Sequence, residues 1–263
     1  MKIGALEGFC KDLMNGQDKP PIAPFAPQAF YPHFLNYNLP EESALGRSCA
    51  FTYLKACDEV YVLGEEIRGD EKVADEPEVR IAKAEGLLIT RSDHGPVTCP
   101  EWRAFNWTSN GNLRSKNLFR EDLKRVYVCT PLREKTNGKL NLKTMGENIG
   151  KTLWICRQLV LDEDNVAPIA PHAFYPYFWR FVNKGEQEGD KYKLWFACSK
   201  AILKICDAVY VYSEYKSDGC PKMSEGMEAI VEEAKELGLE IQYRTLPNDI
   251  PGDWNPDSPR FEC

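Results

Sequence analysis

The chain contains one sequence pattern twice, and this repeat limits the fold more than any other feature. Residues 22–34 read IAPFAPQAFYPHF and residues 166–178 read VAPIAPHAFYPYF, with nine of thirteen positions identical. Two further matches follow in the same order, 49–62 with 198–211 and 79–89 with 231–241. Three collinear matches indicate a duplicated folding unit. The copies are too long for a solenoid repeat, so we expect two small domains.

Composition narrows the class of protein. The 263 residues are 43% hydrophobic and 28% charged, as is usual for a globular protein. No run of eighteen apolar residues occurs, and Met1 is not followed by an apolar signal core, so we expect a cytoplasmic protein without a membrane partner. The net charge of −7 argues against a broad nucleic-acid-binding surface.

The ten cysteines do not form a metal-binding pattern. C-x-x-C spacing is absent, so neither a zinc site nor any other metal or cofactor is predicted. Six cysteines occupy equivalent places in the two copies, in stretches with helical apolar spacing: Cys10 and Cys156, Cys49 and Cys198, Cys57 and Cys206. We therefore expect reduced, buried thiols that act as small hydrophobic side chains.

The second copy alternates predicted strands with predicted helices. The strands are expected at 125–129, 208–212 and 239–243, an extended segment at 167–171, and the helices at 145–161, 191–206 and 224–237. Such alternation favours parallel pairing and a three-layer α/β sandwich. In parallel sheets of this kind, ligands bind at the carboxyl ends of the strands, where the strand order switches.

The predicted domain organisation follows from the repeat. We expect an incomplete first copy at 1–92, a linker at 93–123, a complete second copy at 124–246 and an extended tail at 247–263. The first copy begins with the equivalent of helix 145–161 and lacks the preceding strand. Either the start is truncated, or the first copy takes an edge from elsewhere. An unpaired edge favours association, as a homo-oligomer or as an intramolecular pseudo-dimer.

The loop Thr130-Pro131-Leu132-Arg133 follows the first strand of the second copy directly. A loop in this place presents backbone N–H groups, a hydroxyl and a guanidinium at the carboxyl edge of the sheet. That set of donors suits a phosphate or a sugar hydroxyl. The alternative is that Arg133 is an ordinary solvated surface residue.

The segment Ser224-Glu225-Gly226-Met227 opens the third predicted helix of the second copy. Ser224 can cap this helix, free amide groups can receive an anion, and Gly226 permits close approach of a ligand. The alternative is a simple N-cap with acidic residues that complement the helix dipole.

His172 and the neighbouring aromatic residues are further candidates. His172, whose counterpart in the first copy is Gln28, could be a general acid or base, a ligand contact, or a structural hydrogen-bonding residue. Tyr175 and Phe174 recur in the first copy and could stack on a base. Aromatic residues at this density also fit a core or an interface.

These motifs in this order resemble a known family. V-Y-V-C-T-P-L-R at 126–133, I-A-P-H-A-F-Y-P at 169–176, C-D-A-V-Y-V at 206–211 and S-E-G-M at 224–227 are similar to an uncharacterised bacterial and phage family of the nucleoside 2-deoxyribosyltransferase-like superfamily. The resemblance covers 124–244 well, and 1–90 as a copy without its first strand. It implies tandem flavodoxin-like sandwiches, a pocket for a nucleoside or nucleotide, and chemistry at the N-glycosidic bond.

The resemblance also implies a glutamate beneath the anomeric carbon, four residues after the glycine that opens the third helix. In the second copy this position is Ile230, which can neither attack nor stabilise positive charge. Glu225 and Glu228 are the acids at this helix start, and Glu78 of the first copy aligns with Ile230. The candidate catalytic residues are thus these three glutamates, with Glu78 acting in a composite site opposite Arg133.

Three functions remain open from the sequence. An enzyme would be a nucleoside deoxyribosyltransferase or a deoxynucleotide N-glycosidase that uses one of the three glutamates. A catalytically degenerate domain would bind a nucleoside or nucleotide without cleaving it. A protein-interaction module would use the duplication to present two faces.

Overall fold

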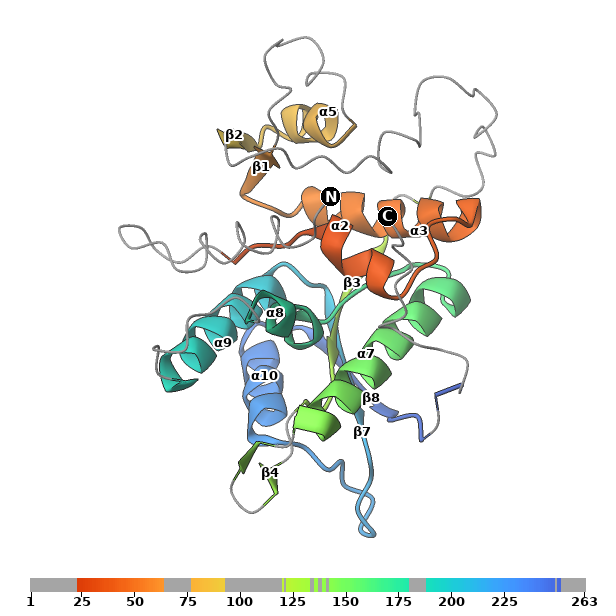
Figure 1. The fold of residues 1–263 in the computed structure, drawn as a ribbon, viewed down its shortest axis with the longest axis vertical. Coiled ribbons are helices and arrows are strands. Elements are labelled where there is room, and N and C mark those ends of the chain that lie inside the picture. Colours follow the sequence, from red (N-terminus) through yellow and green to blue (C-terminus); the bar gives the residue numbers. More distant parts are fainter. Residues whose placement is uncertain are drawn as a thin grey trace.

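A computed structural model describes residues 23–63, 77–92, 120, 122–132, 135–136, 139–140, 142–179, 188–248 and 250–251. The fold is mixed α/β with parallel sheets and is compatible with a flavodoxin-like arrangement, the class expected from the sequence (Figure 1). Most of the predicted linker and tail lies outside the described residues. No helix in the described part of the chain is long and apolar enough to cross a membrane.

A four-stranded parallel sheet forms the centre of the second copy. Its strands lie in the order β6 (Val166–Ile169), β3 (Lys124–Cys129), β7 (Ala208–Ser213) and β8 (Glu240–Thr245). All residues of β6 and β7 and the last four of β3 are buried. Such continuous burial is expected of parallel strands covered on both faces.

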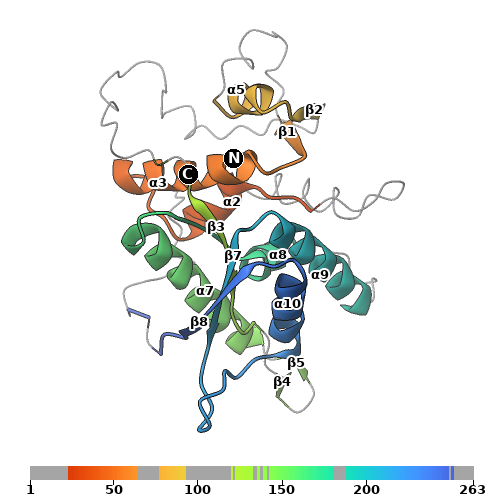
Figure 2. The ribbon, with the colours of Figure 1, turned by 180° about the vertical axis from the view of Figure 1, so that it is seen from behind.

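Helices complete three layers. The helices are α7 (Leu142–Asp162), α8 (Pro171–Trp179), α9 (Glu188–Lys204) and α10 (Glu225–Glu236). Figures 1 and 2 show α7 and α10 on opposite sides of the sheet. α8 was not predicted as a helix, although Pro171 suits its first position. A short hairpin of β4 (Lys135–Thr136) and β5 (Lys139–Leu140) lies where only a loop was expected.

The described part of the first copy repeats the second half of this arrangement. It contains α2 (Pro27–Phe30), the 3-10 helix η1 (Tyr31–His33), α3 (Pro40–Leu54), β1 (Glu59–Leu63), α5 (Pro77–Ala84) and β2 (Leu88–Ser92). β1 and β2 pair in parallel, as their equivalents β7 and β8 do. The two copies also agree in backbone conformation where equivalent helices end. Gly86 and Gly238 follow these helices with φ of 72° and 69°, the left-handed conformation that glycine favours.

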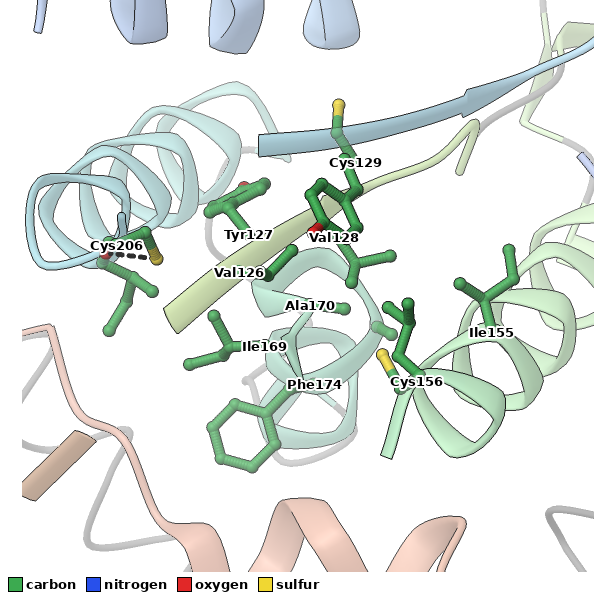
Figure 3. Packing of buried hydrophobic residues seen from close by; sticks show 14 of the residues in the cluster. Val126, Tyr127, Val128, Cys129, Ile155, Cys156, Ile169, Ala170, Phe174 and Cys206 are labelled. Carbon is green, nitrogen blue, oxygen red and sulfur yellow. Dashed lines mark hydrogen bonds between the residues drawn. The ribbon is translucent and has the colours of Figure 1, made fainter. Parts of the chain in front are cut away.

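Both copies contribute to one buried core. Figure 3 shows side chains of β3 packed among those of α7, β6 and α8, including Val126, Cys156, Ile169 and Phe174. Phe30, Tyr31 and Tyr53 of the first copy belong to the same cluster. The described cysteines are reduced. Of the six that were expected to be buried, Cys49, Cys156, Cys198 and Cys206 are buried, Cys57 is only half-buried, and Cys10 lies outside the described residues.

Candidate functional site

The carboxyl edge of the four-stranded sheet is the natural place for a site. β3 leads through α7 to β6 on one side, and β6 leads to β7 on the other side of β3. The strand order therefore switches between β3 and β7, where parallel α/β folds bind ligands. Since Cys129 pairs with Val211, Thr130, which follows β3, and Ser213, which ends β7, lie at the same edge.

A buried polar network occupies one side of this edge. The Thr130 Oγ1 lies 2.6 Å from the Thr152 Oγ1 and 2.8 Å from the His172 Nε2. Thr130 follows β3, Thr152 lies on α7, and His172 lies in the first turn of α8. Three separate elements are thus joined by their polar side chains. Thr130 and His172 were separate candidates from the sequence, whereas Thr152 was not a candidate; the structure brings the three side chains into contact.

The hydrogen bonds fix the tautomer of His172. The Thr152 hydroxyl donates to the carbonyl oxygen of Asn148 at 2.8 Å, so its only proton is engaged. Thr130 must then donate to Thr152 and accept from the Nε2–H of His172. Burial lowers the pKa of His172 from 6.5 to about 4, so the ring is neutral near pH 7. The Nδ1 atom therefore carries a lone pair and is a hydrogen-bond acceptor.

The N-terminus of α10 forms the other side of the edge. After β7 the chain turns back on itself, and the Lys222 N–H donates to the carbonyl of Glu214 at 2.7 Å. Because Glu214 follows β7 and Lys222 comes shortly before α10, the helix starts close to the end of β7. The Ser224 Oγ caps the helix by accepting from the Met227 N–H at 3.4 Å. The amides of Glu225 and Gly226 have no acceptor within the helix.

Ser213, the last residue of β7, was not singled out from the sequence. Its side chain is fully buried, at 0% exposure, and its Oγ has no hydrogen-bond partner among the described residues. Leaving a buried hydroxyl unsatisfied costs about 1–3 kcal/mol. Because Ser213 ends a strand at the carboxyl edge of the sheet, a polar ligand atom there would remove that cost, and we add Ser213 to the candidate residues.

The candidate catalytic acids do not gather at this edge. Glu225 and Glu228 are exposed in the first turn of α10. Ile230, at the position where the resemblance implies a glutamate, is 4% exposed and belongs to the hydrophobic core. The side chain of Glu78, on α5, and all of Arg133 lie outside the described residues. The composite site of Glu78 and Arg133 therefore stays a prediction.

The other predicted ligand-binding residues have different environments. Pro131 is half-buried beside Thr130, and Ser224 is exposed at the cap of α10. Met227 is buried in the core, so only its backbone N–H points to the cap. Tyr175 is buried against the first copy, where its hydroxyl donates to the carbonyl of Pro24 at 3.4 Å. The structure thus assigns Tyr175 to the contact between the copies.

In the described part of the chain, no group of three or more His, Cys, Asp or Glu side chains could hold a metal ion.

Comparisons with curated proteins and with solved structures gave no match. One family model, described as a domain of unknown function (DUF7768), matches residues 4–89 and 124–244, which are most of the chain and correspond to the two copies of the repeat. The chain therefore belongs to the DUF7768 family of domains of unknown function.

Proposed function

We propose that the second copy binds a nucleoside or nucleotide at the carboxyl edge of its sheet, between the N-terminus of α10 and the Thr130–His172 network. The observation that carries this proposal is the fully buried Ser213 Oγ, which has no hydrogen-bond partner among the described residues. It ends β7, the strand that borders the switch in strand order. The resemblance to deoxyribosyltransferase-like proteins supplies the class of ligand.

The groups on the α10 side suit the sugar or phosphate end of such a ligand. The Ser213 and Ser224 hydroxyls and the amides of Glu225 and Gly226 are hydrogen-bond donors at the positive end of a helix dipole. The exposed carboxylates of Glu225 and Glu228 weaken the attraction for a dianion. The proposal therefore includes neutral nucleosides as well as nucleotides.

The groups on the opposite side suit a hydrogen-bond donor of the ligand. His172 is neutral and is held by Thr130 through Nε2, which leaves Nδ1 as an acceptor. An amino group of a base or a hydroxyl of a sugar would match this atom. Because Thr130 in turn contacts Thr152 on α7, the ring has a fixed orientation before any ligand binds.

Binding without cleavage fits the second copy better than glycosidic-bond chemistry does. The resemblance implies a carboxylate at position 230, but Ile230 is buried in the core. Glu225 and Glu228 are exposed and would have to turn inward to reach a sugar. We therefore propose a catalytically degenerate binding domain, and treat an N-glycosidase that uses one of these acids as the alternative.

Thermal unfolding in the presence of ligands tests the proposal. The panel contains the four deoxynucleosides, their 5′-monophosphates and inorganic phosphate. A ligand at 100 times its Kd adds about 2.7 kcal/mol of stability, which raises the Tm by roughly 5–10 °C in a chain of this size. Failure of every member to raise the Tm would overturn the proposal, and release of free base would favour the enzyme.

Ser213→Ala locates the site. The substitution removes a hydroxyl without a partner, so the protein should fold normally and lose most of the ligand-induced rise in Tm. The matched control is Ser43→Ala on α3 of the first copy, whose Oγ is likewise buried without a partner among the described residues. An unchanged ligand response in Ser213→Ala, equal to that of the control, would contradict this site.

A further inference from the structure

Two tyrosines make the same contact in opposite directions. The Tyr31 hydroxyl of the first copy donates to the carbonyl of Pro168 at 3.3 Å, and the Tyr175 hydroxyl of the second copy donates to the carbonyl of Pro24 at 3.4 Å. In the repeat, Tyr31 is equivalent to Tyr175 and Pro24 to Pro168, each 144 residues apart. Reciprocal contacts between equivalent residues define an isologous interface, the kind found in symmetric dimers.

An aromatic pair marks the centre of this interface. Phe30 and Phe174 are equivalent in the repeat, and their rings meet edge to face with centroids 5.8 Å apart. A residue meets its own equivalent only near a twofold axis. Phe25 packs against both rings, at 6.2 Å from Phe30 and 6.4 Å from Phe174. The local axis therefore passes close to the Phe30–Phe174 contact.

The first copy also covers one edge of the four-stranded sheet of the second copy. β6 is an edge strand, and the three consecutive carbonyls of residues 166–168 each accept a hydrogen bond from the first copy. The donors are the Cys49 Sγ at 3.9 Å, the Tyr53 hydroxyl at 3.0 Å and the Tyr31 hydroxyl at 3.3 Å. An uncovered edge of this kind would favour pairing with another chain.

A charged pair makes the interface specific for unlike copies. Glu42 on α3 and Arg157 on α7 form two hydrogen bonds, of 2.5 and 2.6 Å, and Arg157 also donates to the carbonyl of Phe34 at 2.7 Å. By sequence, the equivalents of Glu42 and Arg157 are Lys191 and Lys11. Two second copies would thus bring Arg157 against the position of Lys191, and like charges oppose such a pairing.

We propose that the surface formed by Tyr175, Phe174, Arg157 and the edge of β6 is an isologous interface that is specific for the tandem copy. The chain is then an intramolecular counterpart of a symmetric dimer, in which the first copy takes the place of a second subunit. This inference does not depend on the proposed ligand.

Charge exchange in the full-length chain tests the pairing. Glu42→Arg and Arg157→Glu each leave two like charges at a largely buried position, so each should lower the Tm by roughly 10 °C. The double variant restores an opposite pair and should recover at least half of that loss. Single variants with the wild-type Tm, or a double variant as unstable as the worse single one, would overturn the proposal.

A second comparison tests the symmetry itself. Tyr31→Phe and Tyr175→Phe each remove one hydroxyl from equivalent positions, so both should lower the Tm by the same amount, about 2–4 °C. Tyr61→Phe, in β1 and partly exposed, is the control and should change the Tm less. A loss confined to one of the two interface tyrosines would show that the contact is not symmetric.

Discussion

At the scale of single residues, burial decides the chemistry of His172. The ring is only 8% exposed, and burial lowers its pKa from 6.5 to about 4. The unfolded chain takes up a proton below about pH 6.5, whereas the folded chain does so only near pH 4. Protonation therefore favours unfolding, and the free energy of unfolding should fall by up to about 3 kcal/mol as the pH drops through this range.

Urea unfolding at several pH values between 4 and 7 measures this dependence. The matched variant is His172→Gln, which places in the second copy the residue that the first copy has at position 28. The glutamine cannot titrate, so the variant should show a shallower fall in stability with pH. A variant that follows the wild-type curve would show that another group causes the loss.

Only part of the site could be predicted from single residues. Thr130 and His172 were candidates from the sequence because each follows a strand or extended segment, at the edge of a parallel sheet where ligands are expected to bind. Thr152 and Ser213 carry no comparable local signal. Thr152 is one of many polar positions along α7, and its contact with Thr130 depends on how two elements pack. Ser213 differs from other serines only through its burial and its unsatisfied hydroxyl.

At the scale of elements, apolar periodicity predicted most of the second copy. The strand expected at 208–212 is β7, which ends one residue later, and the helix expected at 224–237 is α10 with its capping residues. α8 was missed because its prolines and aromatic residues give little helical periodicity, and its packing against the first copy is non-local. The contact between the copies could not be read from either copy alone.

The position of Ile230 on α10 gives a prediction for this element. Because Ile230 packs in the core, Ile230→Glu would bury an unpaired carboxylate, and we expect a loss of at least about 3 kcal/mol in the free energy of unfolding. Ile230→Val should cost only about 0.5–1.5 kcal/mol. Urea unfolding compares the two. A stable Ile230→Glu protein would show instead that this position can face the carboxyl edge.

At the scale of the whole molecule, the two copies share one core. Phe30 of α2 packs on Phe174 of α8, and side chains of η1 and α3 bond to the carbonyls of β6. Neither surface could be exposed without placing large apolar side chains in water. The duplication thus gives a structure in which one copy completes the burial of the other, and we expect both to unfold together.

Thiol labelling during urea unfolding measures this coupling. Cys49 lies in the first copy and Cys129 in the second, and burial raises the pKa of each to about 12, so neither should react in the folded protein. Cys220 is exposed and should be labelled without urea. Peptide mass spectrometry measures the labelled fraction of Cys49 and of Cys129 at each urea concentration. If the two copies unfold as one unit, both cysteines will reach half-labelling at the same urea concentration. Labelling of Cys49 at clearly lower urea than Cys129 would mean that the first copy separates and unfolds while the four-stranded sheet persists.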